Sequence, residues 1–582
     1  MEDLLNKHTP LILVLLCIGA FLVAKNSPVA YMGDSFGSLL TSQVILDQRT
    51  IKLDSYMSKG DPPYRTWYQF TKVDGHYYYF FPLGSSFVAI PFVWVENLRG
   101  KDMSDFEDHV ALENTLSALT MVIATLFVYQ ICRCFLNPAF SIIFTTTFIF
   151  GSSIASTMST AFWNINISTV IVLWVMLLLS RDYFKQKQLN PYVAGILLWF
   201  SFITRPTIVV FIGAVFIYSL MHKGWKFTLK LGISMIIPFI GYLLLSYYEF
   251  HQWIIPYYSQ DFNFYLDSYF YRLFGVLFSP SRGLFVFHPY LILVIVGIII
   301  GWKDFLKLPL VWLSLFWICA LVILVSSYTR WWGGYSYGPR LLTESLPGWL
   351  LLSVIVFSAV QKNFGNFAFK GMMVVFTALS VTGIFMHTIQ GLYNENTSLW
   401  NSTPSVDEHN QYIFDWRYPQ FIANPGQLKE KYQNNLLKKL PKFMVNEKIT
   451  PESENVIFIH FSDIERVGGN REIRWATGDF GRIMFKIDAE SIDLNNDIEL
   501  RLNIYVSCPQ VLKIFLDGVK VGEFPVEGEI DETLSVNPRL INFDTPNTLK
   551  LAVSSKDEGT EMTCKKNKGK LLGVFSIDLR QE

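Results

Sequence analysis

Apolar stretches recur along the chain up to about residue 390 and do not continue beyond it. A helix needs roughly 20 apolar residues to cross a lipid bilayer. The stretches that approach this length predict about eleven membrane helices, at 9–25, 110–132, 139–156, 160–180, 191–204, 206–221, 229–248, 285–302, 308–327, 346–361 and 368–389. Residues 1–390 are therefore expected to form a polytopic α-helical membrane domain.

The last part of the chain alternates apolar and polar residues, which is the pattern of half-buried β-strands. The alternation runs through 482–489, 497–506, 511–518, 547–555 and 571–579. Asp517 and Gly518 interrupt the stretch 516–524 as Asp-Gly does at a two-residue hairpin turn. Residues 451–582 are thus expected to fold as an antiparallel β-sandwich of about 130 residues.

Residues 391–450 connect the two regions and contain a basic amphipathic stretch at 426–448. Such a stretch can lie on a lipid surface or on the membrane domain. A solvated connecting helix explains the same pattern equally well, and the sequence leaves both interpretations open.

Basic residues in the short loops give the orientation, because cytoplasmic loops are enriched in lysine and arginine. With the N-terminus inside, the inner loops hold twelve basic residues, ten of them lysine. The short outer loops, which exclude the long first loop 26–109, hold five, and all are arginine: Arg205, Arg272, Arg282, Arg330 and Arg340. An odd number of spans then places residues 391–582 outside the cytoplasm. The apolar start fits an uncleaved first span better than a signal peptide.

The first outer loop, 26–109, is long and contains two apolar elements. In the first, Asp34 precedes apolar residues at helical spacing, so it can cap a helix that lies flat on the membrane. The second, 75–95, is too short and too broken by proline for a confident span, and an interfacial or re-entrant element is expected.

The outer arginines are suited to phosphate, because a planar guanidinium can grip a phosphate group in two places. Arg330 and Arg340 lie in an aromatic, glycine-rich connector, residues 328–347. Arg282 lies in a tight turn at 279–283, just before the next apolar stretch. The outer face is therefore expected to hold an amphiphilic phosphate. An aromatic belt with snorkelling arginines explains the connector about equally well.

Composition narrows the chemistry. The 582 residues are 51% hydrophobic and carry a formal net charge of zero. The chain has no P-loop, dinucleotide fingerprint or CxxC zinc pattern. Of six cysteines, only Cys508 and Cys564 fall in the outer domain, where they could pair in an oxidising compartment. No cofactor is expected, and no metal, because Asp34 has no acidic partner at a fixed spacing.

The loops resemble those of the GT-C glycosyltransferases, polytopic enzymes that use polyprenyl-phosphate sugars. The similar branch, glycosyltransferase family 39, includes protein O-mannosyltransferases and the lipid A aminoarabinose transferase. The resembling residues are Gly33-Asp34-Ser35, the tyrosine-rich run to Phe81-Pro82-Leu83-Gly84, the turn Ser279–Gly283 and the run Trp331–Arg340. The chain departs from the family pattern at Phe80 and Phe81, where relatives often have a charged residue or histidine. It departs again at Ser35, where many have glutamate.

The resemblance implies a GT-C fold, a catalytic role for Asp34 and a donor-phosphate role for outer arginines. Arg282 and Arg340 match best, followed by Arg330 and Arg205. Weaker candidates for contact with the substrate are Tyr337, Trp332, Tyr78, His76 and Glu344. The outer β-sandwich suggests contact with a glycan or acceptor, by analogy alone.

Transfer of a sugar from a lipid phosphate needs a base for the acceptor hydroxyl and positive charge aimed at the leaving phosphate. Asp34 can be the base, and displacement with a single carboxylate predicts inversion at the anomeric carbon. The expected partners are a polyprenyl-phosphate sugar donor, a glycan, lipid or protein acceptor and the lipid bilayer, without nucleic acid. The expected location is a bacterial-type inner or plasma membrane.

Two other functions stay open from the sequence. The first is a flippase or transporter for a lipid-linked or anionic substrate, which usually carries charged groups at mid-membrane. The predicted spans are nearly free of such groups. The second is a glycan-binding or assembly protein that works through the β-sandwich. The sequence indicates neither the sugar nor the acceptor.

Overall fold

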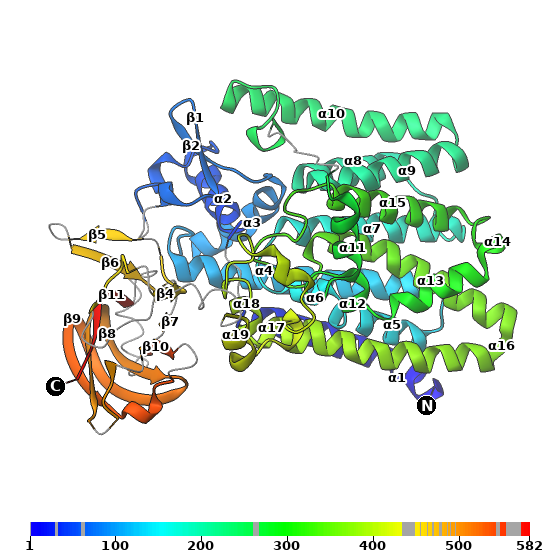
Figure 1. Ribbon diagram of the computed structural model, residues 1–582. Coiled ribbons are helices and arrows are strands. Elements are labelled where there is room, and N and C mark those ends of the chain that lie inside the picture. Colours follow the sequence, from blue (N-terminus) through cyan, green and yellow to red (C-terminus); the bar gives the residue numbers. More distant parts are fainter. Residues whose placement is uncertain are drawn as a thin grey trace.

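The computed structural model describes residues 2–29, 33–59, 64–259, 267–432, 448–453, 456–462, 464–467, 471–476, 480–485, 487–488, 491–494, 496–542, 547–554 and 572–581. A helix bundle makes up most of the molecule (Figure 1). The first loop and the β domain lie at one end of this bundle, and the N-terminus lies at the other.

Each predicted span overlaps at least one helix, and the spans 139–156 and 285–302 each extend over more than one. The helices of the bundle are α1 (Glu2–Lys25), α4 (Phe106–Arg133), α5 (Pro138–Phe150), α7 (Asn164–Tyr183), α8 (Pro191–Thr204), α9 (Val209–His222), α10 (Trp225–Phe250), α13 (Leu291–Ile300), α15 (Pro309–Ser326) and α16 (Leu346–Ile384). Within the described part of the chain, six helical stretches are long and apolar enough to cross a membrane. A polytopic membrane protein is thus supported, while the number of eleven spans stays a prediction.

Capping residues and prolines explain where several of these helices begin. The Asp105 side chain accepts hydrogen bonds from the backbone N–H groups of Glu107 and Asp108 at the start of α4. Asn137 and Asn190 cap α5 and α8, each followed by proline at the first helical position. The last two predicted spans are continuous as α16, but Gly365 has a φ of 78° inside it, so the helix is interrupted there.

The first outer loop forms a small compact unit. It contains α2 (Phe36–Gln48), η1 (Asp54–Tyr56), η2 (Tyr64–Thr66), the hairpin β1 (Phe70–Val73) and β2 (His76–Tyr79), and α3 (Gly84–Leu98). The expected second element at 75–95 is therefore a strand followed by a helix. Two details of the first element were wrong. The N-cap residue of α2 is Ser35 rather than Asp34, and residues 36–44 are all buried, so protein rather than lipid covers this helix.

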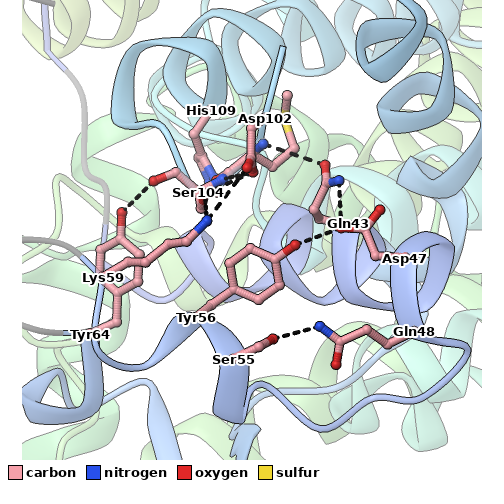
Figure 2. Close-up of polar contacts among 11 residues, drawn as sticks. Gln43, Asp47, Gln48, Ser55, Tyr56, Lys59, Tyr64, Asp102, Ser104 and His109 are labelled. Atoms are coloured by element: carbon pink, nitrogen blue, oxygen red, sulfur yellow. Dashed lines mark hydrogen bonds and ion pairs between the residues drawn. The ribbon is translucent and has the colours of Figure 1, made fainter. Parts of the chain in front are cut away.

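Polar contacts fix the second half of α2 to the chain that follows it (Figure 2). The Asp47 carboxylate accepts hydrogen bonds from Gln43 at 2.9 Å and from the Tyr56 hydroxyl at 2.6 Å. The Lys59 ammonium lies 3.5 Å from the Asp102 carboxylate and donates to the Ser104 hydroxyl at 2.8 Å. These contacts join three segments of the loop and hold the second half of α2 in place.

Short elements connect and follow the long helices. They are α6 (Ser153–Met158), η3 (Pro206–Ile208), η4 (Pro256–Ser259), α11 (Tyr269–Phe278), α12 (Leu284–Phe287), α14 (Trp302–Phe305), η5 (Arg340–Ser345), η6 (Phe385–Gln390), α17 (Gly391–Tyr393), α18 (Glu395–Leu399), η7 (Asn410–Phe414), η8 (Gln420–Ile422) and α19 (Pro425–Tyr432). The predicted amphipathic stretch 426–448 begins in α19, and residues 433–447 lie outside the described part of the chain.

The C-terminal domain is antiparallel in every described strand pair. Its strands are β3 (Lys448–Ile449), β4 (Val456–Ile459), β5 (Glu465–Val467), β6 (Arg471–Trp475), β7 (Phe480–Phe485), β8 (Ile498–Leu516), β9 (Val519–Val536), β10 (Asn547–Ser554) and β11 (Leu572–Arg580), with η11 (Pro538–Leu540) after β9. Asp517 and Gly518 have φ of 48° and 86° and turn β8 into β9, as the Asp-Gly pair predicts.

One long hairpin joins the two halves of this domain. The first part of β8 pairs with β11 and its second part with β10, while β9 runs beside both. The register shifts between Val506 and Gln510, where a bulge separates the two parts. Both halves contribute to one apolar core. The predicted β domain is confirmed, but its described strands form one nine-stranded sheet rather than the two separate sheets of a sandwich. The proposed Cys508–Cys564 pair lies outside what the structure describes.

Candidate active site

A cavity of about 710 Å³ opens where the first loop meets the loops after α8 and α15. We name it the arginine cavity, because Arg205, Arg330 and Arg340 line it together with Asp34. The rest of the lining is largely aromatic and includes Tyr79, Phe80, Phe81, Trp163, Tyr257 and Tyr328. The sequence therefore predicted four residues that the fold gathers around one space.

Asp34 lies just before α2, with its side chain 32% exposed. Its Oδ1 accepts a hydrogen bond from the Tyr68 hydroxyl at 2.6 Å, and its Oδ2 accepts one from the Arg340 guanidinium at 3.0 Å. A carboxylate has about four acceptor positions, so these two bonds leave capacity for a hydroxyl that enters the cavity. Burial and the nearby Asp34 charge raise the pKa of Tyr68, which therefore stays a hydrogen-bond donor.

The backbone around Asp34 is clamped by side chains near the β1–β2 hairpin. The Gln69 side-chain amide donates to the Gly33 carbonyl at 3.0 Å, and the Tyr79 hydroxyl donates to the Asp34 carbonyl. Tyr79 packs so closely on Gly37 that any side chain there would collide with its ring. Tyr68, Gln69 and Tyr79 were not identified from the sequence beyond the tyrosine-rich run. Together they fix the position of the Asp34 carboxylate.

Arg340 begins η5 and bridges two parts of the site. Its guanidinium lies 4.0 Å from the centre of the Trp163 ring, in the range of a cation–π contact. The opposite contact is the 3.0 Å ion pair with Asp34. A flat guanidinium held over a ring keeps its remaining N–H groups in a defined plane, which suits binding of a phosphate.

Arg205 lies between α8 and η3 and contacts the carboxylate of Glu344. Glu344 is 1% exposed and also accepts hydrogen bonds from the Thr207 hydroxyl at 2.7 and 2.9 Å. Burial and then the nearby Arg340 lower the pKa of Arg205 to about 10, so the guanidinium stays charged at neutral pH. Glu344 was expected to contact substrate, but it is outside the lining of the cavity and pairs with Arg205.

Arg330 is exposed at the rim of the cavity. It makes no ion pair with any residue that the structure describes. Among the described residues, the carboxylates that pair with the three arginines of the cavity are Asp34 and, for Arg205, Glu344. These described groups carry one more positive than negative charge, which favours an anion in the cavity.

Arg282 lies outside the arginine cavity. The side chain, 3% exposed, donates hydrogen bonds to the Trp332 carbonyl at 2.8 Å, the Asn401 side chain at 2.7 Å and the Gln420 side chain. Its guanidinium also lies 5.6 Å from the centre of the Trp400 ring. Arg282 thus joins the aromatic connector to the segment after α17, instead of lying near outer headgroups as expected.

The other predicted contact residues also lie elsewhere. Tyr337 is buried and donates to the Met386 carbonyl at 2.5 Å, while the Trp332 indole donates to Asp407 at 2.8 Å. Tyr78 is buried and donates to the Glu249 carbonyl at 2.7 Å. His76 is exposed on the hairpin, 2.7 Å from the Asp54 carboxylate. None of these four lines the arginine cavity.

Comparisons with known proteins find similarity only among solved structures. No family model and no curated protein matches the sequence. Among solved structures, the chain is similar to an oligosaccharyltransferase from Archaeoglobus fulgidus tethered with an acceptor peptide containing the NVT sequon, with 12% identity and a TM-score of 0.41 over 69% of this chain and 59% of that one. A second structure is the archaeal oligosaccharyltransferase AglB of the same organism with an inhibitory peptide and a dolichol-phosphate, with 13% identity and a TM-score of 0.39 over 70% and 60%.

The third structure is arabinosyltransferase EmbB from Mycobacterium smegmatis, with 10% identity and a TM-score of 0.37 over 98% of this chain and 64% of that one. The chain spans about 60% of the length of these proteins. All three are named as transferases of sugars, the class that the sequence motifs resemble. Likeness this remote says nothing of the reaction, which depends on the residues of the arginine cavity.

Proposed function

We propose that the protein is a membrane glycosyltransferase that moves a sugar from a polyprenyl-phosphate donor to an acceptor hydroxyl outside the cytoplasm. The observation that carries this proposal is the convergence of one carboxylate and three arginines on a single cavity. Asp34 acts as the base, and the arginines bind the donor phosphate. A transferase of this type needs these groups together at the membrane surface.

The reaction is a single displacement. The acceptor oxygen attacks the anomeric carbon and gives its proton to Asp34, while the bond from that carbon to the phosphate oxygen breaks. The leaving polyprenyl phosphate keeps the electron pair, and Arg330 and Arg340 stabilise its charge. Attack opposite the leaving group inverts the anomeric configuration. The 3.0 Å contact between Arg340 and Asp34 keeps the phosphate-binding group and the base close to each other.

The apolar part of the lining fits the lipid end of the donor. Val209 at the start of α9 and Leu324 and Val325 at the end of α15 contribute to the cavity wall. Both helices are apolar along their length. A polyprenyl chain that lies against these residues would leave its phosphate at the arginines, because the polar and apolar parts of the lining adjoin.

The test is transfer of labelled sugar by the purified protein in detergent, without any ion gradient. Polyprenyl-phosphate sugars are offered as donors, and sugar nucleotides are offered in parallel. We expect consumption of the lipid-linked donor alone. Asp34→Asn should lower the rate by about 10²–10⁴-fold, the usual contribution of a general base.

Arg99→Ala is the matched control, because Arg99 is exposed on the same predicted face and, among the described residues, pairs only with Glu96 of the first loop. It should retain the wild-type rate. A folded Asp34→Asn protein with normal transfer would remove Asp34 from the chemistry. Absence of turnover with every lipid-linked donor and acceptor tried would count against the transferase and favour a carrier or a binding protein.

A further inference from the structure

A group of basic residues lies on one face of the β domain, away from the arginine cavity. Lys550 of β10 stands directly opposite Arg482 of β7 in the strand register. Residues paired in this way point to the same face of a sheet, and like charges at such positions destabilise it. The arrangement therefore costs stability unless something compensates the two charges.

An aromatic residue organises the two cations. The Phe480 ring centre lies 4.6 Å from the Lys550 ammonium and 5.2 Å from the Arg482 guanidinium. The His460 ring packs against the same phenylalanine at 5.1 Å, edge to face. We name Arg482, Lys550 and His460, gathered around Phe480, the basic seam.

The polar groups of the basic seam have unused hydrogen-bonding capacity. All three side chains are half-buried, and none makes a hydrogen bond or ion pair with a residue in the described ranges. Burial, followed by the nearby Arg482 and Lys550 charges, lowers the pKa of His460 to about 4, so its ring is neutral at pH 7 and offers one N–H donor. His460 also has a φ of 60°, which is strained for a residue other than glycine.

The basic seam faces the membrane part of the protein. Ile459 and Met484, on the same face as Arg482 by register, are buried and belong to the same apolar cluster as residues of the helix bundle. Lys429 of α19 lies 3.3 Å from Asp517 at the β8–β9 turn, so the two parts are in contact (Figure 1). Among the described residues, the exposed Glu395 on α18 carries the carboxylate whose charge acts on both Arg482 and Lys550.

We propose that the basic seam binds a phosphate or carboxylate group carried by the acceptor glycan. A guanidinium, an ammonium and a neutral imidazole N–H, set around one ring and half-shielded from water, bind an anion more strongly than the same groups would in full solvent. The position beside α18 and α19 lies on the same end of the bundle as the arginine cavity. The glycan as the source of the anion rests on the function proposed above, whereas binding of the anion does not.

The experiment measures binding to the full-length protein in detergent, without turnover. The probes are hexagalacturonate, neutral maltohexaose, inorganic phosphate and dihexanoylphosphatidylglycerol. We expect hexagalacturonate to bind at least tenfold more tightly than maltohexaose, to be displaced by inorganic phosphate and to weaken with salt. The double variant Arg482→Gln/Lys550→Gln should lose about tenfold or more in affinity for hexagalacturonate.

The matched control is Lys520→Gln/Arg539→Gln, which removes the same charge from exposed positions of the same domain. It should bind as wild type does. Equal binding of hexagalacturonate by the Arg482→Gln/Lys550→Gln protein, or equal binding of maltohexaose by wild type, overturns the proposal. If phosphatidylglycerol is the only probe that binds, and it binds through the same residues, the anion comes from a lipid and the acceptor glycan is excluded as its source.

Thermal unfolding separates a binding role from a structural one. Arg482 and Lys550 are two positive charges that stand opposite each other on neighbouring strands of the sheet and destabilise it. Removing both should therefore leave the midpoint temperature of unfolding unchanged or raise it by roughly 1–2 °C. A lower midpoint for Arg482→Gln/Lys550→Gln than for wild type would assign the cations to the fold and overturn the binding site. Intact anion binding in a protein that transfers no sugar would count against the transferase and leave the basic seam in place.

Discussion

Arg282 and Arg340 both belong to the arginines that the sequence predicts on the outer face, yet they make different contacts in the fold. Arg282 is buried and donates to carbonyl and amide oxygens of Trp332, Asn401 and Gln420. Arg340 lies in a cavity and pairs with the carboxylate of Asp34. A carboxylate can exchange places with a phosphate as substrate binds, whereas internal carbonyls cannot leave. The partner of an arginine, more than its place in a motif, therefore indicates whether it binds substrate.

Among the variants that test this comparison, substitutions of the cavity arginines should cause the largest loss of transfer activity. Arg340→Ala should lower transfer by about 10²–10³-fold, because loss of one group that stabilises the leaving charge has this size in other enzymes. Arg330→Ala should act in the same direction, since Arg330 faces the cavity at its rim. Rates with labelled lipid-linked donor at saturating acceptor measure both. Near wild-type turnover by folded Arg340→Ala protein would end the distinction between the two kinds of arginine.

Whether the sequence can predict that an arginine binds substrate depends on where in the chain the residues that contact this arginine lie. Placement of Asp34, Arg205, Arg330 and Arg340 on one face followed from the span pattern, and the cavity that they line agrees with it. The structural role of Arg282 did not follow from the span pattern, because its partners Asn401 and Gln420 are 119 and 138 residues further along the chain. No local pattern links such residues, and a tight turn before a span looks the same whether its arginine points outward or inward.

Prediction of the fold from the sequence has the same limit. Hydrophobic length located the helices, and alternation located the strands, because both are local properties. The apolar residues of α2 predicted a helix on the membrane, but residues 36–44 are covered by protein on all sides. Periodicity reports that a side chain avoids water, without saying whether lipid or protein replaces it. The bent β8–β9 hairpin likewise depends on pairing with β10 and β11, which come much later in the chain.

A smaller loss of transfer rate is expected from substitution of Tyr68, whose hydroxyl donates a hydrogen bond to Asp34. Tyr68→Phe removes the 2.6 Å hydrogen bond to Asp34 Oδ1 and leaves the ring in place. The rate should fall by about tenfold, in keeping with the loss of one hydrogen bond to a charged group. Because its raised pKa keeps the phenol protonated, the ratio of wild-type to variant rates should stay constant from roughly pH 7 to 9.

Kinetics at each pH, with KM for the donor measured separately, check this role. Loss confined to kcat fits a group that positions the base, and Tyr79→Phe provides a comparison because Tyr79 holds the Asp34 carbonyl instead of its carboxylate. A change in donor KM alone would place Tyr68 on the donor and separate it from Asp34.

The smallest effect on transfer is expected for Arg282→Lys. Lysine keeps the charge but lacks the planar fork, so the oxygens of Asn401, Gln420 and Trp332 cannot all be satisfied. The unfolding free energy should fall by on the order of 3 kcal/mol, while the KM for the lipid-linked donor changes by less than about threefold. Thermal unfolding in detergent and kinetics well below the midpoint measure the two quantities. A stable Arg282→Lys protein with a much higher donor KM would place Arg282 on the phosphate, and the burial of its guanidinium would then have to open when the donor binds.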